Sequence, residues 1–230
     1  MINRRDFLKT SALAAAAGTT LAGLTGCAST PSARSRAHVV VVGGGYGGAT
    51  AAKYLRMWSE GTVDVTLIER NPSFVSCPVS NLVIGGLMQM EDITVSYDNL
   101  KSKWGVRLIT DEVIAVDTAK RSVSTANNGT LSYDRLVLSP GIDFMTDAIA
   151  GLAGNEERIP HAWKAGAQTV LLRKQLEAMP DGGVFAMHIP RAPYRCPPGP
   201  YERACMVAGY FKSAKAKSKV VVFDANDDIQ

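Results

Sequence analysis

Two short stretches of the sequence combine residue types that can do chemistry. The first is a G-x-G-x-x-G pattern at 43–48, which follows a β-branched run at 38–42 and precedes a helical pattern. The second is Cys196, which two prolines follow directly. A glycine-rich turn before a helix presents backbone N–H groups to phosphates, whereas proline has no N–H to donate. The first stretch therefore predicts a dinucleotide site, and the second predicts a sulfur atom held in a rigid loop.

The three glycines of the first pattern have separate roles. Gly43 permits a tight turn, Gly45 lets the backbone approach a pyrophosphate, and Gly48 allows close helix–sheet packing. Glu69 ends the next predicted strand, where an acid accepts hydrogen bonds from ribose hydroxyls. Together with the flanking strands and helix, these residues predict a bound dinucleotide; the alternative is a tight turn with no ligand.

The loop at Cys196 stands where a second dinucleotide fingerprint is expected. Because its prolines cannot build an amide cradle for phosphate, we expect that NAD(P)H does not bind there. A disulfide at Cys196 would accept attack by a small thiolate or hydrosulfide; a structural disulfide or an idle thiol is the alternative. Cys205, on the following predicted helix, is expected in the core. A bridge to Cys196 is the alternative, less favoured because the helix would have to bend.

The elements that must position these residues alternate between strand and helix. Predicted strands lie at 38–42, 63–69, 106–109, 111–117, 121–125, 130–133, 135–138, 183–189 and 219–224, and predicted helices at 49–58, 97–104, 168–179 and 200–213. Residues 71–91 are expected to be irregular. Such alternation predicts an α/β protein with a parallel sheet. The three histidines have no metal-ligand spacing, so no metal site is predicted.

The end of the strand at 135–138 favours FAD over NAD at the first site. Ser139-Pro140-Gly141 resembles the "ATG"-type motif of flavoproteins with two dinucleotide-binding domains, in which this strand returns to the FAD domain after a β-hairpin layer. We therefore expect Pro140 and Gly141 beside FAD, and a backbone group of Val113 at its adenine. Cys77, in the loop after Glu69, could bond to the flavin's methyl carbon or act as a redox thiol; the alternative is a small buried residue.

The first 36 residues are interpreted as a targeting segment and linker. A twin arginine, Arg4-Arg5, precedes an alanine-rich apolar run, as in signals that export folded proteins to the periplasm. Cys27 ends a sequence resembling a lipoprotein cleavage box, with plain cleavage as the alternative. The formal charge of +4 resides in this segment, since the remainder has 20 basic and 20 acidic residues. No basic stripe with aromatics points to nucleic acid.

Taken together, these residues resemble the flavoprotein subunit of flavocytochrome c sulfide dehydrogenase, from about Ala37 onward. The resemblance is carried by V-V-V-V-G-G-G at 39–45, G-G-A-T-A-A-K-Y at 47–54, Cys77 with Ser80-Asn81, I-G-G at 84–86, P-H-A-W-K-A-G at 160–166, R-K-Q-L-E at 173–177 and R-C-P-P-G-P-Y-E-R-A at 195–204. The last run is the most specific.

The resemblance implies FAD attached through a thioether to Cys77 and a redox-active disulfide that includes Cys196. Sulfide would attack this disulfide to give a persulfide, and the released thiolate would pass electrons to the flavin. FAD can accept two electrons and release them singly, and the resemblance implies a c-type cytochrome as the acceptor.

We therefore expect a Rossmann-like FAD-binding domain at 37–150 and the start of a second Rossmann-like domain at 151–230. The expected function is oxidation of sulfide to sulfur or polysulfide in the periplasm, with membrane contact only through a lipidated Cys27. An NAD(P)H-dependent flavin disulfide reductase is an alternative, opposed by the missing second fingerprint and the export signal. An inactive FAD-binding fragment is another, because the family's second redox cysteine, second FAD-contacting motif and C-terminal domain would lie beyond residue 230.

Overall fold

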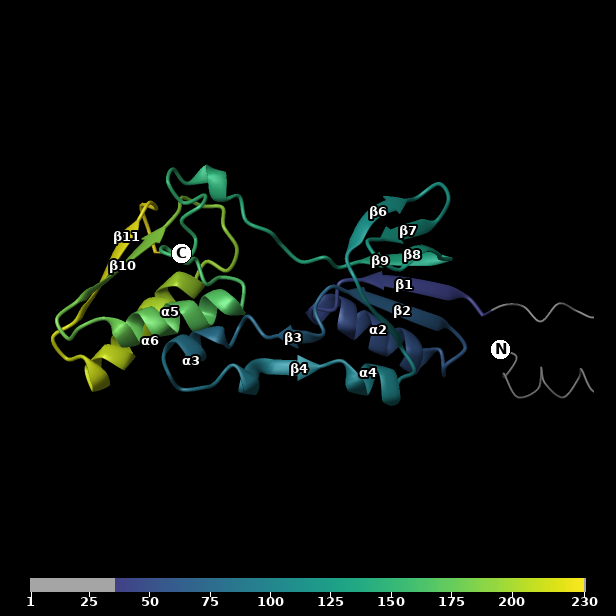
Figure 1. Ribbon diagram of the computed structural model, residues 1–230, viewed down its shortest axis with the longest axis horizontal. Helices are drawn as coiled ribbons and strands as arrows, with labels where there is room; N and C mark the ends of the chain where they lie inside the picture. Colours follow the sequence, from purple (N-terminus) through teal and green to yellow (C-terminus); the bar gives the residue numbers. More distant parts are fainter. Residues whose placement is uncertain (1–35, 230) are drawn as a thin grey trace, which may run out of the picture. The chain divides into compact units, whose positions relative to one another are not determined.

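The structure, a computed structural model, describes residues 36–229 (Figure 1). The twin-arginine segment and Cys27 lie outside the described residues. A four-stranded parallel sheet has the order β5-β2-β1-β9, made of β1 (His38–Val42), β2 (Asp64–Glu69), β5 (Arg107–Thr110) and β9 (Arg135–Leu138). The predicted α/β class is confirmed.

Residues of β1 alternate between two buried faces of this sheet. Val39 and Val41 pack in one hydrophobic cluster with Ala52 of helix α2 (Tyr46–Trp58). Val40 and Val42 pack in another with Val123 of strand β7 (Ser122–Thr125). Both faces of the strand are covered, as is usual in parallel sheets, which explains its continuous run of valines.

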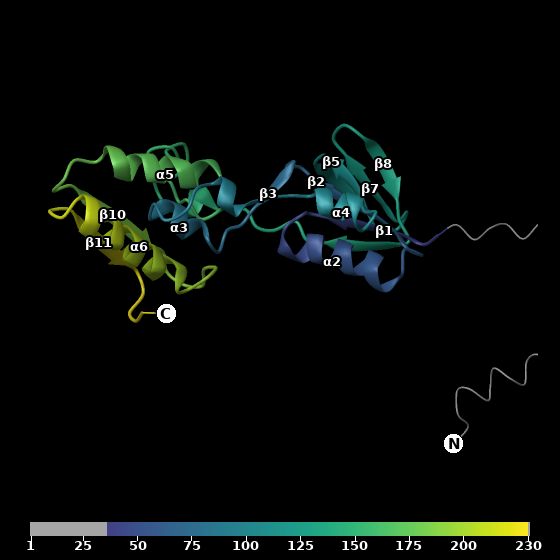
Figure 2. The same ribbon diagram turned by 90° about the horizontal axis from the view of Figure 1, so that it is seen from below.

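The second face is covered by a three-stranded antiparallel sheet, β6 (Val113–Asp117), β7 and β8 (Gly129–Ser132), as Figure 2 shows. The predicted strand from residue 111 begins at Val113 because Asp111 binds the turn of the hairpin instead. Its carboxylate accepts the backbone N–H groups of Asn127 and Asn128, both at 2.9 Å. Hydrogen bonding, first from the Asn128 side chain, holds the pKa of Asp111 well below its usual value.

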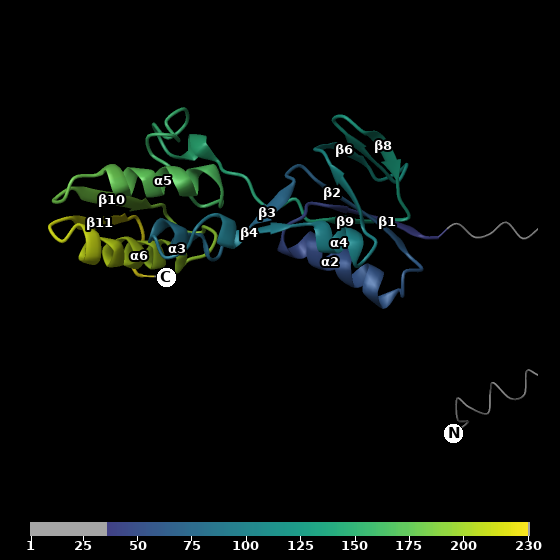
Figure 3. The ribbon, with the colours of Figure 1, turned by 60° about the horizontal axis from the view of Figure 1, so that its bottom comes forward.

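A second βαβ unit consists of β10 (Val184–Ile189), α6 (Gly199–Ala214) and β11 (Lys219–Asp224), whose strands are parallel and in register over six residues. Helix α5 (Ala167–Ala178) and α3 (Ser80–Ile84) pack beside it (Figure 3). Their shared core contains Ile84, Leu172, Leu176, Val207 and Phe211.

The expectation that 71–91 would be irregular is wrong. This stretch contains α3 and β3 (Ser73–Val75), which pairs with β4 (Thr94–Ser96). These elements have three to five residues each, too few to show a periodic pattern in sequence. The remaining short elements are η1 (Glu91–Ile93), α4 (Asp98–Ser102) and η2 (Thr146–Ala148).

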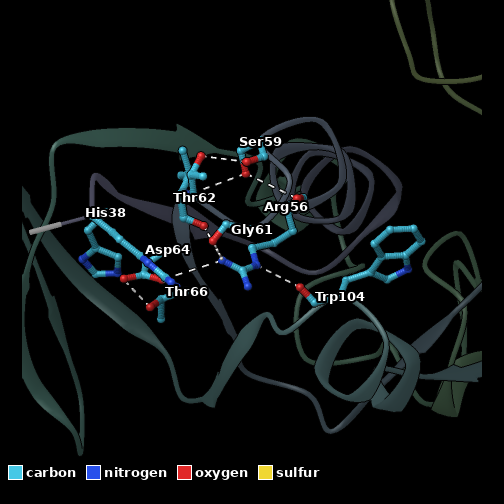
Figure 4. A network of polar contacts seen from close by, with 10 residues as sticks. His38, Arg56, Ser59, Gly61, Thr62, Asp64, Thr66 and Trp104 are labelled. Carbon is cyan, nitrogen blue, oxygen red and sulfur yellow. Dashed lines mark hydrogen bonds and ion pairs between the residues drawn. The ribbon is translucent and has the colours of Figure 1, made fainter.

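A polar network fixes the amino ends of β1 and β2, at the sheet edge opposite the glycine pattern (Figure 4). Arg56 donates to the carbonyl of Trp104 at 2.9 Å and lies 3.7 Å from the carboxylate of Asp64. The ring of His38 bonds to Thr66 Oγ1 at 2.8 Å and to the Ser132 carbonyl at 2.9 Å. Both ring nitrogens of this histidine are therefore occupied in structural contacts.

Candidate functional site

The glycine pattern forms the turn from β1 into α2, at the carboxyl edge of the sheet. Gly43 has a φ of +93°, and a Cβ on it would lie 2.1 Å from the carbonyl oxygen of Ser139. A Cβ on Gly48 would lie 1.8 Å from the Gly43 carbonyl oxygen. Any side chain at either position would collide with backbone, so the close approach of helix and strand requires both glycines.

Gly45 is different because the protein itself leaves space around it. A Cβ there would have only Phe74 within 4 Å, at 3.8 Å. Gly45 is also the N-cap of α2, whose first turn has no capping side chain and no acidic residue. Its first-turn N–H groups are therefore open to an anion. This arrangement fits the pyrophosphate of a dinucleotide.

Glu69 ends β2 beside this turn. Its carboxylate accepts the N–H of Gly44 at 2.7 Å and that of Asn71 at 2.9 Å. Tyr97, which sequence reasoning did not single out, donates its hydroxyl to the Gly44 carbonyl at 3.0 Å. Burial, and then the charge of Glu69, raises the pKa of Tyr97 to about 12. The turn is thus held by side chains from two other segments.

The other residues expected at FAD lie in different surroundings. Pro140 follows β9, and its Cα lies 3.2 Å from the position that a Cβ on Gly43 would take. Gly141 has a φ of +84°, with nothing within 4 Å of its Cβ position. The side chain of Val113 packs in the core cluster that contains Val40. The fold brings Pro140 beside the glycine turn, whereas the side chain of Val113 is core.

Cys77 lies in the loop between β3 and α3, and its side chain is exposed. Its thiol donates to the carbonyl oxygen of Trp163 at 3.0 Å. The carbonyl of Cys77 accepts both the N–H of Ser80, at 3.0 Å, and its hydroxyl, at 2.7 Å. The loop therefore has a fixed backbone and presents an accessible sulfur.

Cys196 is exposed as well, in the turn that leads into α6. Its φ is +60°, in the left-handed region that favours glycine. The N–H of Gly199 donates to the Cys196 carbonyl at 3.0 Å. A Cβ on Gly199 would lie 3.1 Å from the sulfur of Cys196 and 2.5 Å from the ring edge of Trp163. The tryptophan that binds Cys77 through its carbonyl thus lies against the Cys196 turn through its ring.

Arg203 of α6, only 5% exposed, joins the segments that carry these cysteines. Its guanidinium donates to Asn81 Oδ1 at 3.0 Å, to the His161 carbonyl at 2.6 Å and to the Ala162 carbonyl at 2.6 Å. It also lies 5.0 Å from the ring of Trp163. Sequence reasoning missed Arg203 as a functional candidate; the signal available was its place in the 195–204 run.

The pKa values near Arg203 follow from burial and charge. Burial lowers the pKa of Arg203 to about 10, although electrostatic interactions with Cys77 and Glu202 act to raise it. Burial, and then the charge of Arg203, lowers the pKa of His161. A neutral His161 can accept the N–H of Trp163 on Nδ1, at 3.0 Å. At neutral pH, the segment therefore combines a charged arginine with an uncharged histidine.

The expectation that Cys205 lies in the core is wrong, because its side chain is exposed. The buried positions of α6 include Arg203, Val207 and Phe211, which recur every four residues. Cys205 falls between them on the other side of the helix. Within residues 36–229 all three cysteines are free thiols.

The second βαβ unit also has an acid at the end of its second strand. Asp224 accepts the hydroxyl of Tyr201 at 2.6 Å and the N–H of Asn226 at 2.9 Å, and these bonds lower its pKa. The Asn226 amide bonds to the carbonyl of Pro190 at 3.0 Å and the N–H of Ala192 at 2.8 Å. The loops after β10 and β11 are thereby tied together.

Within the described part of the chain, His, Cys, Asp and Glu side chains form no group that could hold a metal ion. Over the same residues, no helix has the length and apolar character needed to cross a membrane.

Comparison with known families gives three matches. Residues 37–177 match the pyridine nucleotide-disulphide oxidoreductase family, and residues 169–230 match the central part of the sulfide dehydrogenase [flavocytochrome c] flavoprotein chain. Residues 1–22 match the twin-arginine translocation pathway signal sequence.

Individual relatives agree with these matches. The sulfide dehydrogenase [flavocytochrome c] flavoprotein chain of Chlorobaculum thiosulfatiphilum is 58% identical over 46 residues, 20% of this chain and 94% of that sequence. Sulfide-quinone reductase of Aquifex aeolicus is 32% identical over 120 residues, 52% of this chain and 27% of that protein.

The solved structure of the sulfide:quinone oxidoreductase from Aquifex aeolicus superposes with a TM-score of 0.63 and 27% identity. The match covers 81% of this chain and 43% of that one. The chain thus spans less than half the length of these Aquifex aeolicus proteins.

Proposed function

Because the chain belongs to the flavoprotein chains of flavocytochrome c sulfide dehydrogenase, within the pyridine nucleotide-disulphide oxidoreductase family, we propose that it is the flavin-carrying subunit of a sulfide-oxidising enzyme. One observation carries the proposal: two accessible cysteines lie near Trp163, because the Cys77 thiol bonds to its carbonyl and the Cys196 sulfur and the Trp163 ring edge both lie next to Gly199. The site thereby combines a sulfur that can anchor a cofactor with a sulfur that can react.

FAD is the cofactor that the glycine turn supports. The open N-terminus of α2 at Gly45 would hold the pyrophosphate, and Glu69 would bind the ribose hydroxyls. Gly43, Gly48, Pro140 and Gly141 would shape the turn around it. Bound FAD would supply acceptance of an electron pair and release of single electrons.

Cys77 would anchor the flavin through a thioether. Its loop is short, its backbone is fixed by Ser80, and its thiol is exposed. An anchored flavin cannot dissociate, which suits a subunit that acts outside the cytoplasm.

Cys196 would form half of a redox disulfide whose other cysteine lies outside these 230 residues. Hydrosulfide attack on this disulfide would form one new S–S bond and break the old one, releasing a cysteine thiolate. The electron pair would then pass to the flavin and singly to a c-type cytochrome. The product would be sulfur or polysulfide.

The twin-arginine signal supports export of the folded, flavin-loaded subunit to the periplasm. Lipidation of Cys27 would add a membrane anchor there.

Acid precipitation tests the flavin anchor. We expect the wild-type protein to retain its yellow colour in the pellet, the Cys77→Ser variant to release its flavin, and the Cys205→Ser control to behave as wild type. Release of free FAD from the wild-type protein would contradict the thioether.

Electron transfer tests the role of Cys196 in the complete protein. Sulfide-dependent cytochrome c reduction should collapse in the Cys196→Ala variant and persist in Cys205→Ser. NADH should leave the flavin oxidised; bleaching by NADH would instead support a flavin disulfide reductase. Retained turnover in Cys196→Ala would exclude the disulfide step.

A further inference from the structure

Arg203 is a buried cation that forms no salt bridge within residues 36–229. Its three hydrogen bonds go to a side-chain amide and two backbone carbonyls. Across residues 36–229, no carboxylate lies within ion-pair distance of its guanidinium. Burying an arginine charge costs free energy that neutral acceptors offset only in part. Stability alone is therefore a poor explanation for an arginine here.

The acceptors of Arg203 belong to the segments that carry the candidate site. Asn81 lies in α3, directly after the Cys77 loop. His161 and Ala162 immediately precede Trp163. Arg203 itself lies in the first half of α6, which the Cys196 turn starts. One guanidinium therefore connects three segments that are far apart in sequence.

Trp163 is the residue these bonds hold in place. Its backbone N–H donates to His161 Nδ1 at 3.0 Å, and the centre of its ring lies 5.0 Å from the Arg203 guanidinium. Its carbonyl accepts the Cys77 thiol, and its ring edge lies with the Cys196 sulfur against Gly199. A shift of Trp163 would therefore change the surroundings of both sulfurs.

We propose that Arg203 is a positioning residue that, through Trp163, sets the relative position of the Cys77 and Cys196 sulfurs. The functional meaning of this spacing rests on the proposed function, since it would decide how the reactive sulfur meets an anchored flavin. Lysine could not replace the arginine fully, because its single ammonium cannot present the planar set of donors that the three acceptors require.

Thiol cross-linking tests the spacing without flavin or sulfide. The full chain is made by cell-free synthesis without flavin, treated with a short bis-maleimide, and digested for mass spectrometry. We expect a 77–196 cross-link in the wild type. Arg203→Met should reduce its yield about tenfold, because the effective concentration of one thiol at the other falls. Arg203→Lys should give an intermediate yield.

Arg173 provides the matched control. It also donates to α3, at the Ile84 carbonyl, and it pairs with Glu177 at 2.7 Å. Arg173→Met should therefore loosen the packing of α3 on α5 but leave the cross-link intact. An unchanged yield in Arg203→Met, or an equal loss in Arg173→Met, would overturn the proposal.

Trp163→Phe provides a readout that survives if Arg203→Met does not fold. It retains the carbonyl that binds Cys77 and removes the ring edge that lies, with the Cys196 sulfur, against Gly199. We expect iodoacetamide to alkylate Cys196 several-fold faster and Cys77 at its wild-type rate; equal changes at both cysteines would overturn the proposal. A wild-type cross-link in a chain that never anchors flavin would refute the proposed function and leave this inference standing.

Discussion

The two βαβ units of this protein share a topology and differ in the loop that follows the first strand. In β1–α2–β2 that loop is a glycine turn, with Gly43 at φ +93°. In β10–α6–β11 it contains Cys196 at φ +60°, followed by two prolines. Both loops thus turn through the left-handed region, but only the first uses glycine to do so.

The acids at the ends of the second strands differ in the same way. Glu69 accepts the N–H of Gly44 within the glycine turn, where we propose that a nucleotide binds. Asp224 instead accepts the hydroxyl of Tyr201. A shared topology therefore does not determine the ligand. The loop chemistry favours phosphate in one unit and sulfur in the other.

The largest expected contrast is between two helical glycines, one in each unit. Gly48→Ala places a Cβ 1.8 Å from the Gly43 carbonyl and should destabilise the fold by about 3 kcal/mol and abolish FAD binding. Gly209→Ala in α6, where nothing lies within 4 Å, should stabilise it by about 0.5–1 kcal/mol. Urea unfolding and flavin titration measure both variants. Similar changes in stability for Gly48→Ala and Gly209→Ala would contradict the expected difference between the two units.

A smaller contrast concerns the left-handed residue of each turn. Cys196→Gly relieves the cost of a side chain at φ +60° and should leave the protein about 0.5–1 kcal/mol more stable than Cys196→Ala. Gly43→Ala should be destabilising, since its Cβ would strike Ser139. Thermal unfolding of the three variants measures this. Equal stabilities of the two Cys196 variants would mean that the turn stores no strain.

The smallest contrast is between two tyrosine hydroxyls, and it depends on pH. Tyr97 has a pKa raised to about 12. The contribution of its hydroxyl to the free energy of unfolding is therefore complete below the ordinary pKa of about 10 and is lost as pH rises through 12. Asp224, bound by Tyr201, has a lowered pKa, so its contribution is complete above about 3.9 and is lost in acid.

Tyr97→Phe should therefore be less stable than wild type by about 1 kcal/mol at neutral pH, with the difference vanishing in alkali. Tyr201→Phe should be less stable than wild type at neutral pH, and the two stabilities should become equal in acid, where Asp224 is protonated. Denaturant midpoints across pH measure both. A stability difference from wild type that stays constant across pH, in either variant, would contradict the role given to that hydroxyl.

Local sequence was sufficient for the strands of the two parallel sheets and for the glycine turn. The valines of β1 are β-branched and apolar, and Gly43 and Gly48 each meet backbone that leaves no room for a Cβ. The strands follow from local residue types, and the turn follows from the G-x-G-x-x-G pattern, although the backbone that Gly43 meets belongs to the distant Ser139. By contrast, α3 and β3 are too short for periodicity: α3 packs in a core with residues of α5 and α6, and β3 pairs with β4.

Residue types alone predict a glycine turn suited to a dinucleotide and a rigid cysteine loop, because the backbone properties of glycine and proline are local. The fold brings the Trp163 carbonyl to Cys77 and its ring edge to Gly199 beside Cys196, places Arg203 at the Trp163 ring, and leaves Cys205 exposed. Hydrogen bonds to backbone carbonyls cannot be predicted from residue types, because every residue has a carbonyl. His161 and Ala162 accept from Arg203 through atoms that every residue has, so the contact depends on chain path alone.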